Sequence, residues 1–136
     1  MISNNVAPYV LAMIVCDEAW RDPNTGKLTL LGIFNTVMAD EFPFQLPQIV
    51  VYFTLTDGRG RFVISVRFVA VGEEDEGISE TSAVIAFADP RALHEGEVRL
   101  VGAVLPRPGE YRFQLLAGED LLLERRIEVR VPWSEA

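Results

Sequence analysis

The sequence is poor in the residues that most often carry catalysis and bind metals. It contains a single cysteine, Cys16, and a single histidine, His94, among 136 residues. One cysteine excludes an intrachain disulfide and a cysteine-rich metal site, and one histidine excludes most histidine-based metal sites. We therefore expect no disulfide framework, no metal site and no cofactor.

Long apolar runs and clustered positive charge are also missing. No stretch approaches the ~18 consecutive apolar residues of a transmembrane helix, and residues 1–9 contain none of the basic residues that begin a signal peptide. The net charge is -8, whereas binding to a phosphate backbone requires clustered lysine and arginine. We expect a cytoplasmic protein that binds neither membrane nor nucleic acid.

The chain does have enough apolar side chain for a core, since hydrophobic residues make up 49% of it. Its length suits one domain and leaves no room for two ordinary ones. We expect a single β-sandwich domain over residues 6–133, with short N-terminal and C-terminal tails.

Short apolar segments recur along the chain between Gly, Pro, Asp and Asn residues, which is the spacing of β-strands. No amphipathic stretch is long enough for a full helix, although residues 91–95 could form one helical turn. About eight strands are expected, at residues 9–17, 27–39, 48–56, 61–71, 81–88, 97–105, 110–117 and 121–131.

Two of these segments alternate clearly between apolar and polar positions, as half-buried strands do. They are residues 48–56 and 61–71, and Asp57-Gly58 stands between them. Asp-Gly tolerates the positive φ angles of a tight hairpin turn, so we expect these two strands to pair. In the last segment Arg125 shares the parity of the core positions, which predicts a bulge near Glu124 or an edge strand.

These counts favour an all-β fold: a two-sheet antiparallel sandwich of about eight strands, of immunoglobulin-like type. Pro108-Gly109 followed by Tyr111 is similar to the turn that introduces a late strand with a tyrosine anchor in such sandwiches. A jelly roll or a distorted barrel is the alternative.

The first two segments differ from the others because they are apolar on both faces. A strand that is apolar on both faces is covered on both faces, yet the outer face of a two-layer sandwich normally meets water. Either the loop at residues 42–47 or a second subunit should cover this hairpin. The candidate interface residues are Leu11, Met13, Val15, Leu31 and Ile33.

Several short motifs, in their order and spacing, are similar to those of a family of short single-domain bacterial β proteins of unknown function. They are Cys16-Asp17, Arg21-Asp22, Thr25-Gly26-Lys27-Leu28, Leu31-Gly32-Ile33-Phe34, Asp57-Gly58-Arg59-Gly60, Pro106-Arg107-Pro108-Gly109-Glu110-Tyr111 and Leu123-Glu124-Arg125-Arg126. The resemblance covers nearly the whole chain. It implies a small β protein and assigns no catalytic or binding residue.

Acidic residues form the most prominent charged feature. Between Glu73 and Glu97 there are eight acids and one arginine, a net charge of -7 out of -8 for the chain. The candidate acidic patch is Glu73, Glu74, Asp75 and Glu76. It could bind calcium at a sandwich tip, attract a basic partner, or simply be a solvated loop.

The remaining candidates are single residues. A Cys16–His94 dyad lacks an orienting group, and Cys16 ends an apolar strand, where a cysteine is usually a buried hydrophobe. Trp20 and Trp133 lie near strand ends, where they could cap the core or contact a sugar or a partner.

We therefore expect a non-enzymatic protein-interaction or structural module that self-associates or is a subunit of a larger assembly. The alternative is a ligand-binding sandwich that uses loop-tip residues for calcium or carbohydrate. A hydrolase with scattered carboxylates is the weakest interpretation, since no catalytic motif supports it.

Overall fold

The computed structural model describes residues 5–132, and within them the chain forms eleven β-strands and no helix. The strands are β1 (Tyr9–Arg21), β2 (Leu28–Ile33), β3 (Thr36–Met38), β4 (Phe44–Gln45), β5 (Gln48–Thr56), β6 (Gly60–Ala70), β7 (Glu76–Phe87), β8 (His94–Val101), β9 (Val104–Leu105), β10 (Gly109–Ala117) and β11 (Asp120–Arg130). No helix that could cross a bilayer occurs in this part of the chain. Eight of the strands have six or more residues, which agrees with the expected number.

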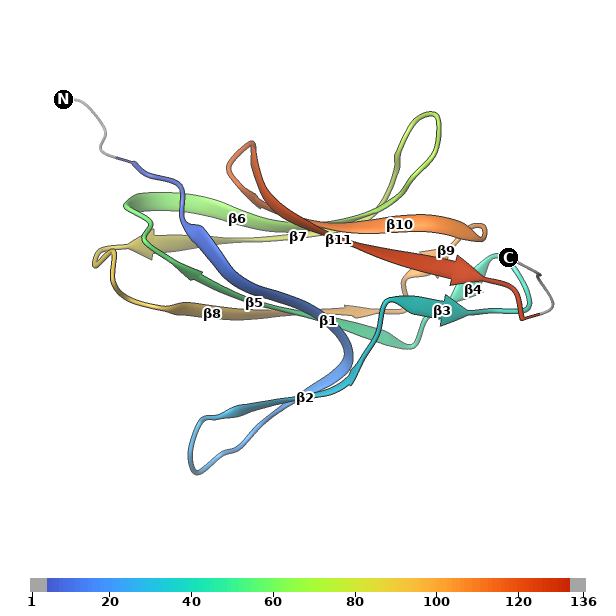
Figure 1. Ribbon diagram of the computed structural model, residues 1–136, viewed down its shortest axis with the longest axis horizontal. Coiled ribbons are helices and arrows are strands. Elements are labelled where there is room, and N and C mark those ends of the chain that lie inside the picture. The colour runs from blue at the N-terminus through green and yellow to red at the C-terminus, as the bar shows by residue number, and fades with distance from the viewer. Residues whose placement is uncertain (1–4, 133–136) are drawn as a thin grey trace.

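The strands form two layers, as Figure 1 shows. A four-stranded sheet has the order β2-β1-β5-β8, a five-stranded sheet has the order β3-β11-β10-β6-β7, and β4 pairs with β9. Every pairing is antiparallel except that of β3 with β11. Over residues 5–132 the sheets do not close into a barrel, so the sandwich prediction is confirmed at this level.

The core lies between the two sheets and is built from alternate residues of each strand. Phe68 and Phe113 stack at its centre with ring centroids 4.2 Å apart. The largest fully buried side chains are Tyr111, Phe68, Phe113, Met13, Ile49, Leu55, Leu105, Leu115, Ile127, Val50, Val51 and Val129. All but Val50 belong to the cluster between the sheets.

The expected hairpin between residues 48–56 and 61–71 is wrong. The strands exist, but β5 pairs with β1 and β8, whereas β6 pairs with β10 and β7. Asp57 does adopt a positive φ of 61°. The turn chemistry was therefore correct, but the link crosses from one sheet to the other, and each strand finds its neighbours elsewhere in the chain.

Two expected strands are divided in the structure. Residues 27–39 form β2 in one sheet and β3 in the other, and residues 97–105 are split between β8 and β9. The expected helical turn at residues 91–95 is absent, and His94 already belongs to β8. In both divided strands the apolar pattern continues across a break at which the backbone changes sheets.

The C-terminal hairpin is confirmed. β10 pairs with β11 along its length, with a register shift between Leu115 and Leu116. Arg125 stays exposed and donates from Nε to the Met13 carbonyl at 2.8 Å, across to the other sheet. The Tyr111 hydroxyl donates to the Arg107 carbonyl at 2.6 Å, which fixes the turn before β10.

Candidate interaction surface

β1 changes partners along its length. Up to Cys16 it pairs with β5, and from Cys16 to Arg21 it pairs with β2. The β1–β2 hairpin leaves the plane of the sandwich and projects from the layer that contains β5 and β8 (Figure 1). Its turn includes Gly26, whose φ is 72°, and the Asp22 carboxylate, which accepts from the Asn24 amide at 2.8 Å.

One face of this hairpin packs back on the outside of the four-stranded sheet. Cys16, Ala19 and Val50 are fully buried there beneath Leu28 and Leu30 of β2. The chain therefore covers this apolar face itself. The loop at residues 42–47, proposed as the cover, contributes its side chains to the main core instead.

Arg99 of β8 holds the hairpin in place. Its guanidinium donates to the Ala19 carbonyl at 2.7 Å and is paired with the Glu18 carboxylate. Gln48 donates from Nε2 to the same carboxylate at 2.9 Å and to the Asp17 carbonyl at 3.0 Å. Hydrogen bonds from Gln48 and Arg99 lower the pKa of Glu18 to about 2, so the clamp is ionised at neutral pH.

A second set of contacts ties the hairpin tip to the sheet. Arg21 pairs with Glu95 at 3.3 Å and donates to the Gly26 carbonyl at 2.7 Å. The Tyr52 hydroxyl donates to the other Glu95 oxygen at 2.7 Å. Burial raises the pKa of Tyr52, so it remains a neutral donor. The projecting hairpin is therefore braced at both ends.

Three apolar side chains of the hairpin remain exposed. Trp20, Leu31 and Ile33 are 54%, 50% and 66% exposed. Trp20 is paired with Thr29 and Leu31 with Glu18, so the indole and Leu31 are diagonal neighbours on one face. We call these three residues the hairpin strip.

The five candidate interface residues separate into two groups. Met13 and Val15 are 1% and 5% exposed in the core between the sheets, so neither can contact a partner from outside. Leu11 is 57% exposed and lies where the register of β1 with β5 shifts. Leu31 and Ile33 belong to the hairpin strip. Burial in the core explains why one face of this segment is apolar, which removes Met13 and Val15 from the candidates.

The acidic patch is the loop that joins β6 to β7. Glu73, Glu74, Asp75 and Glu76 are all exposed. The Asp75 carboxylate accepts from the Gly72 amide at 3.3 Å, which closes a local turn. Within residues 5–132 no three His, Cys, Asp or Glu side chains are placed to hold a metal ion. The geometry therefore offers calcium no ligand set here.

Cys16 and His94 are far apart. They pair with Val50 and Leu55, which are five residues apart along β5, or about 16 Å. Cys16 lies in the outer cluster, while Leu55 faces the core. Burial raises the pKa of the Cys16 thiol, which donates to the Glu18 carbonyl at 3.4 Å. Distance and an un-ionised thiol rule out a dyad. Trp133 lies outside the described residues.

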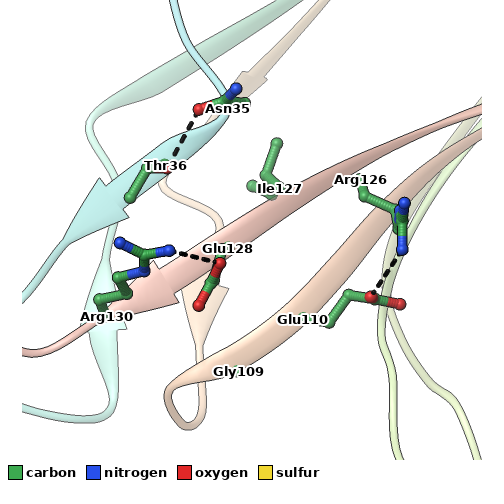
Figure 2. Close-up of a pocket in the computed structure, with 8 residues that line it drawn as sticks. All are labelled: Asn35, Thr36, Gly109, Glu110, Arg126, Ile127, Glu128 and Arg130. Atoms are coloured by element: carbon green, nitrogen blue, oxygen red, sulfur yellow. Dashed lines mark hydrogen bonds and ion pairs between the residues drawn. The ribbon is translucent and has the colours of Figure 1, made fainter. Parts of the chain in front are cut away.

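A shallow depression of about 690 Å³ lies beside β3, β10 and β11, and Figure 2 shows the residues that line it. Its charged side chains are paired with one another. Arg130 contacts Glu128 at 2.9 Å, and Arg126 contacts Glu110 at 3.6 Å. The hydrogen bond from Arg130 lowers the pKa of Glu128. The charged groups that line this depression are therefore engaged with one another.

The clamp could not be found from the sequence. Arg99 and Glu18 are 81 positions apart, and each resembles an ordinary surface charge. The apolar character of Trp20, Leu31 and Ile33 was visible, but their exposure depends on how β1 and β2 pair and pack. The sequence feature that pointed to this surface was the apolar content of both faces of the N-terminal hairpin.

Comparison with known proteins gives a family and distant structural likenesses. A family model described as "Family of unknown function (DUF6941)" matches residues 11–130. No curated protein matches the sequence.

The chain is similar to a Pseudomonas fluorescens alkylpurine DNA glycosylase AlkC bound to DNA (12% identity, TM-score 0.49), covering 87% of this chain and 30% of that one. It is also similar to a β-glucosidase from Listeria innocua (15% identity, TM-score 0.45), covering 90% of this chain and 16% of that one. A third likeness is to a β-glucosidase from Erythrobacter marinus (14% identity, TM-score 0.45), covering 87% of this chain and 15% of that one. The chain spans less than a third of each of these solved proteins.

Proposed function

This chain belongs to DUF6941, a family of unknown function, and we propose that it acts through protein–protein contact without catalysing a reaction. In this proposal it is an interaction module that self-associates or docks as a subunit of a larger assembly. The observation that carries the proposal is the hairpin strip: Trp20, Leu31 and Ile33 are at least half exposed on a braced, projecting hairpin (Figure 1).

The composition of the strip supports this role. Interfaces combine an apolar centre with a polar rim, and tryptophan is among the residues that contribute most to binding. Thr29 and Glu18, the cross-strand partners of Trp20 and Leu31, supply polar groups around it. The Arg99 clamp holds the hairpin before binding, so little conformational entropy is lost when a partner docks.

We propose in addition that the sandwich is of the immunoglobulin-like type. Among the long strands other than β2, the sheets read first-second-fifth (β1-β5-β8) and seventh-sixth-third-fourth (β11-β10-β6-β7). This order agrees with that of a constant-type immunoglobulin domain except that the fourth strand lies beside the third and not beside the fifth, and the agreement supports the proposal. The Tyr111 hydroxyl bond to the Arg107 carbonyl supports it, because a tyrosine corner at this strand is typical of the fold.

A cytoplasmic location forms part of the proposal. Its support is Cys16, a free thiol that is fully buried. A lone structural cysteine is compatible with a reducing compartment, where disulfides are rare.

Replacing Ile33 with arginine tests the function. The change places a charge at the most exposed position of the strip and leaves both cores untouched. If the hairpin strip forms the contact, Ile33→Arg should raise the Kd for the partner about thirtyfold or more, because a hot-spot residue contributes ~2 kcal/mol or more to the binding free energy. Sedimentation velocity measures self-association of the purified chain. Native mass spectrometry of the tagged full chain, isolated from its own cells, measures whether it is bound in a larger assembly.

Leu121→Arg is the matched control, since Leu121 is 48% exposed and lies in the five-stranded sheet. It should behave as the wild type in both measurements. The proposal is wrong if Ile33→Arg and Leu121→Arg both leave self-association and assembly unchanged.

A further inference from the structure

β7 is an edge strand of unusual length and exposure. It has twelve residues and pairs with β6 on one side, and no other strand of residues 5–132 pairs with its second side. Among the long strands it is one of the most exposed, and Val84 is 58% exposed. An edge of this kind presents unpaired N–H and C=O groups that can pair with another strand.

The backbone groups that face outward can be identified. The Val63 carbonyl accepts from the Gly118 amide at 2.8 Å, so the polar groups of Val63 point away from β7. Val63 is the partner of Val84, and this is therefore a pair without mutual hydrogen bonds. The N–H and C=O of Val84 must point to the open side. By the alternation of a strand, Ser82 and Ala86 do the same.

The other sheet edges carry features that discourage pairing. β8 has Glu95, Glu97 and Arg99 within eight residues, and β3 is three residues long. β2 contains Gly32 in the left-handed region, with a φ of 69°. In β7, by contrast, residues 81–87 contain no charge, proline or glycine.

We propose that β7 pairs with β7 of a second copy of this chain, antiparallel, about a two-fold axis at Val84. Val84 then faces its own counterpart, and Ser82 faces Ala86 on both sides of the axis. About six backbone hydrogen bonds join the copies. This surface uses no residue of the hairpin strip, so it goes beyond the function proposed above.

The apolar residues at the centre of β7 and the lack of charge around them favour the second copy as the occupant. Val63 is 48% exposed beside Val84, so the axis brings four valines into one row across the seam. Pairing about Val84 places residues 81–87 of the two copies opposite each other, and this segment carries no charge. No like charges therefore face each other along it, although each chain has a net charge of -8.

Sedimentation velocity of the full chain over a concentration series tests the proposal. The wild type should show a concentration-dependent dimer. Val84→Lys places two like charges at the axis and should raise the dimer Kd at least tenfold. Val84→Pro should also raise the dimer Kd, because it removes the outward-facing N–H that would bond to the second copy. It should leave the pairing with β6 intact, because that N–H does not bond to β6. The melting temperature of Val84→Lys should stay near the wild-type value.

A cysteine at the axis keeps the proposal testable if either variant misfolds. Directly paired residues have Cα atoms about 5.5 Å apart, within the range of a disulfide. Val84→Cys should form a reducible dimer faster than Leu121→Cys, which places an exposed cysteine on β11 away from this edge. The proposal is overturned if the wild type is monomeric at every concentration, if Val84→Lys is folded and keeps the wild-type Kd, or if both cysteine variants crosslink at one rate.

The same measurement separates the two surfaces. Ile33→Arg should leave the β7 dimer intact. A dimer that Ile33→Arg dissociates and Val84→Lys does not would overturn the β7 proposal and support the hairpin strip.

Discussion

The two sheets of the sandwich share one core but treat their outer faces differently. The outer face of the four-stranded sheet carries the buried Cys16 and Val50, and the β1–β2 hairpin covers them. No segment of residues 5–132 forms such a cluster on the outer face of the five-stranded sheet. That face carries ion pairs instead, such as Arg112 with Glu110 at 2.8 Å and Arg67 with Glu80 at 3.3 Å.

This difference shows how one small domain can expose two distinct surfaces. The hairpin covers the first sheet with some of its apolar side chains and leaves others, the hairpin strip, exposed. The second sheet carries ion pairs on its outer face, and its long edge strand β7 pairs with β6 alone among the strands of residues 5–132. The residues that could bind a partner are therefore those that neither sheet uses to cover or solvate its outer face.

The largest change in stability is expected from substituting one of two glycines that lie in edge strands of the two sheets. A Cβ on Gly96 of β8 would lie 2.4 Å from the Phe53 ring, whereas one on Gly77 of β7 would meet nothing within 4 Å. Gly96→Ala must displace a core aromatic and should reduce the free energy of unfolding by about 1–3 kcal/mol. Gly77→Ala should be neutral or stabilising by up to about 1 kcal/mol. Urea unfolding measures both, and equal effects would contradict the tight packing of Phe53 on β8.

Much of the fold could be predicted from the sequence because strands leave a local pattern. The bounds of β5 and the β10–β11 hairpin followed from alternation and from Gly118 at the turn. Which strands pair did not follow. Asp57-Gly58 has the chemistry of a hairpin turn, yet the neighbours of β5 and β6 are set by packing between distant segments.

The candidate surface could be predicted only in part, for a related reason. Apolar residues on both faces of the N-terminal hairpin correctly signalled that something must cover it. The cover is β2 itself, and only coordinates distinguish the buried Val15 from the exposed Ile33. The openness of β7 depends on what does not pair with it, which no local pattern encodes.

Removing the Arg99 guanidinium should loosen the covered sheet selectively. Arg99→Met keeps the aliphatic stem but leaves the Ala19 carbonyl and the Glu18 carboxylate without their partner. The amides of β2 should exchange with solvent about tenfold faster, while those of β10 stay protected, because the hairpin can open without the core. Hydrogen exchange followed by NMR measures this.

Arg67→Met is the control, since it removes an ion pair of the uncovered sheet that holds no segment in place. It should leave β2 exchange unchanged. Wild-type protection of β2 in Arg99→Met would show that the outer apolar cluster alone fixes the hairpin.

The smallest expected effect is a pH dependence of the same clamp. The pKa of Glu18 is lowered from about 4.5 to about 2 by hydrogen bonds from Gln48 and Arg99. Because the pKa is lower in the folded chain, the carboxylate stabilises the fold fully above about pH 4.5, and this contribution is lost as pH falls toward 2. Glu18→Gln should therefore flatten the dependence of stability on pH within this window. Glu119→Gln, which removes the same charge from an exposed turn, should leave that dependence unchanged. An NMR titration that finds the pKa of Glu18 near 4.5 would show that the clamp does not form in solution, and the rigidity of the hairpin strip would then need another source.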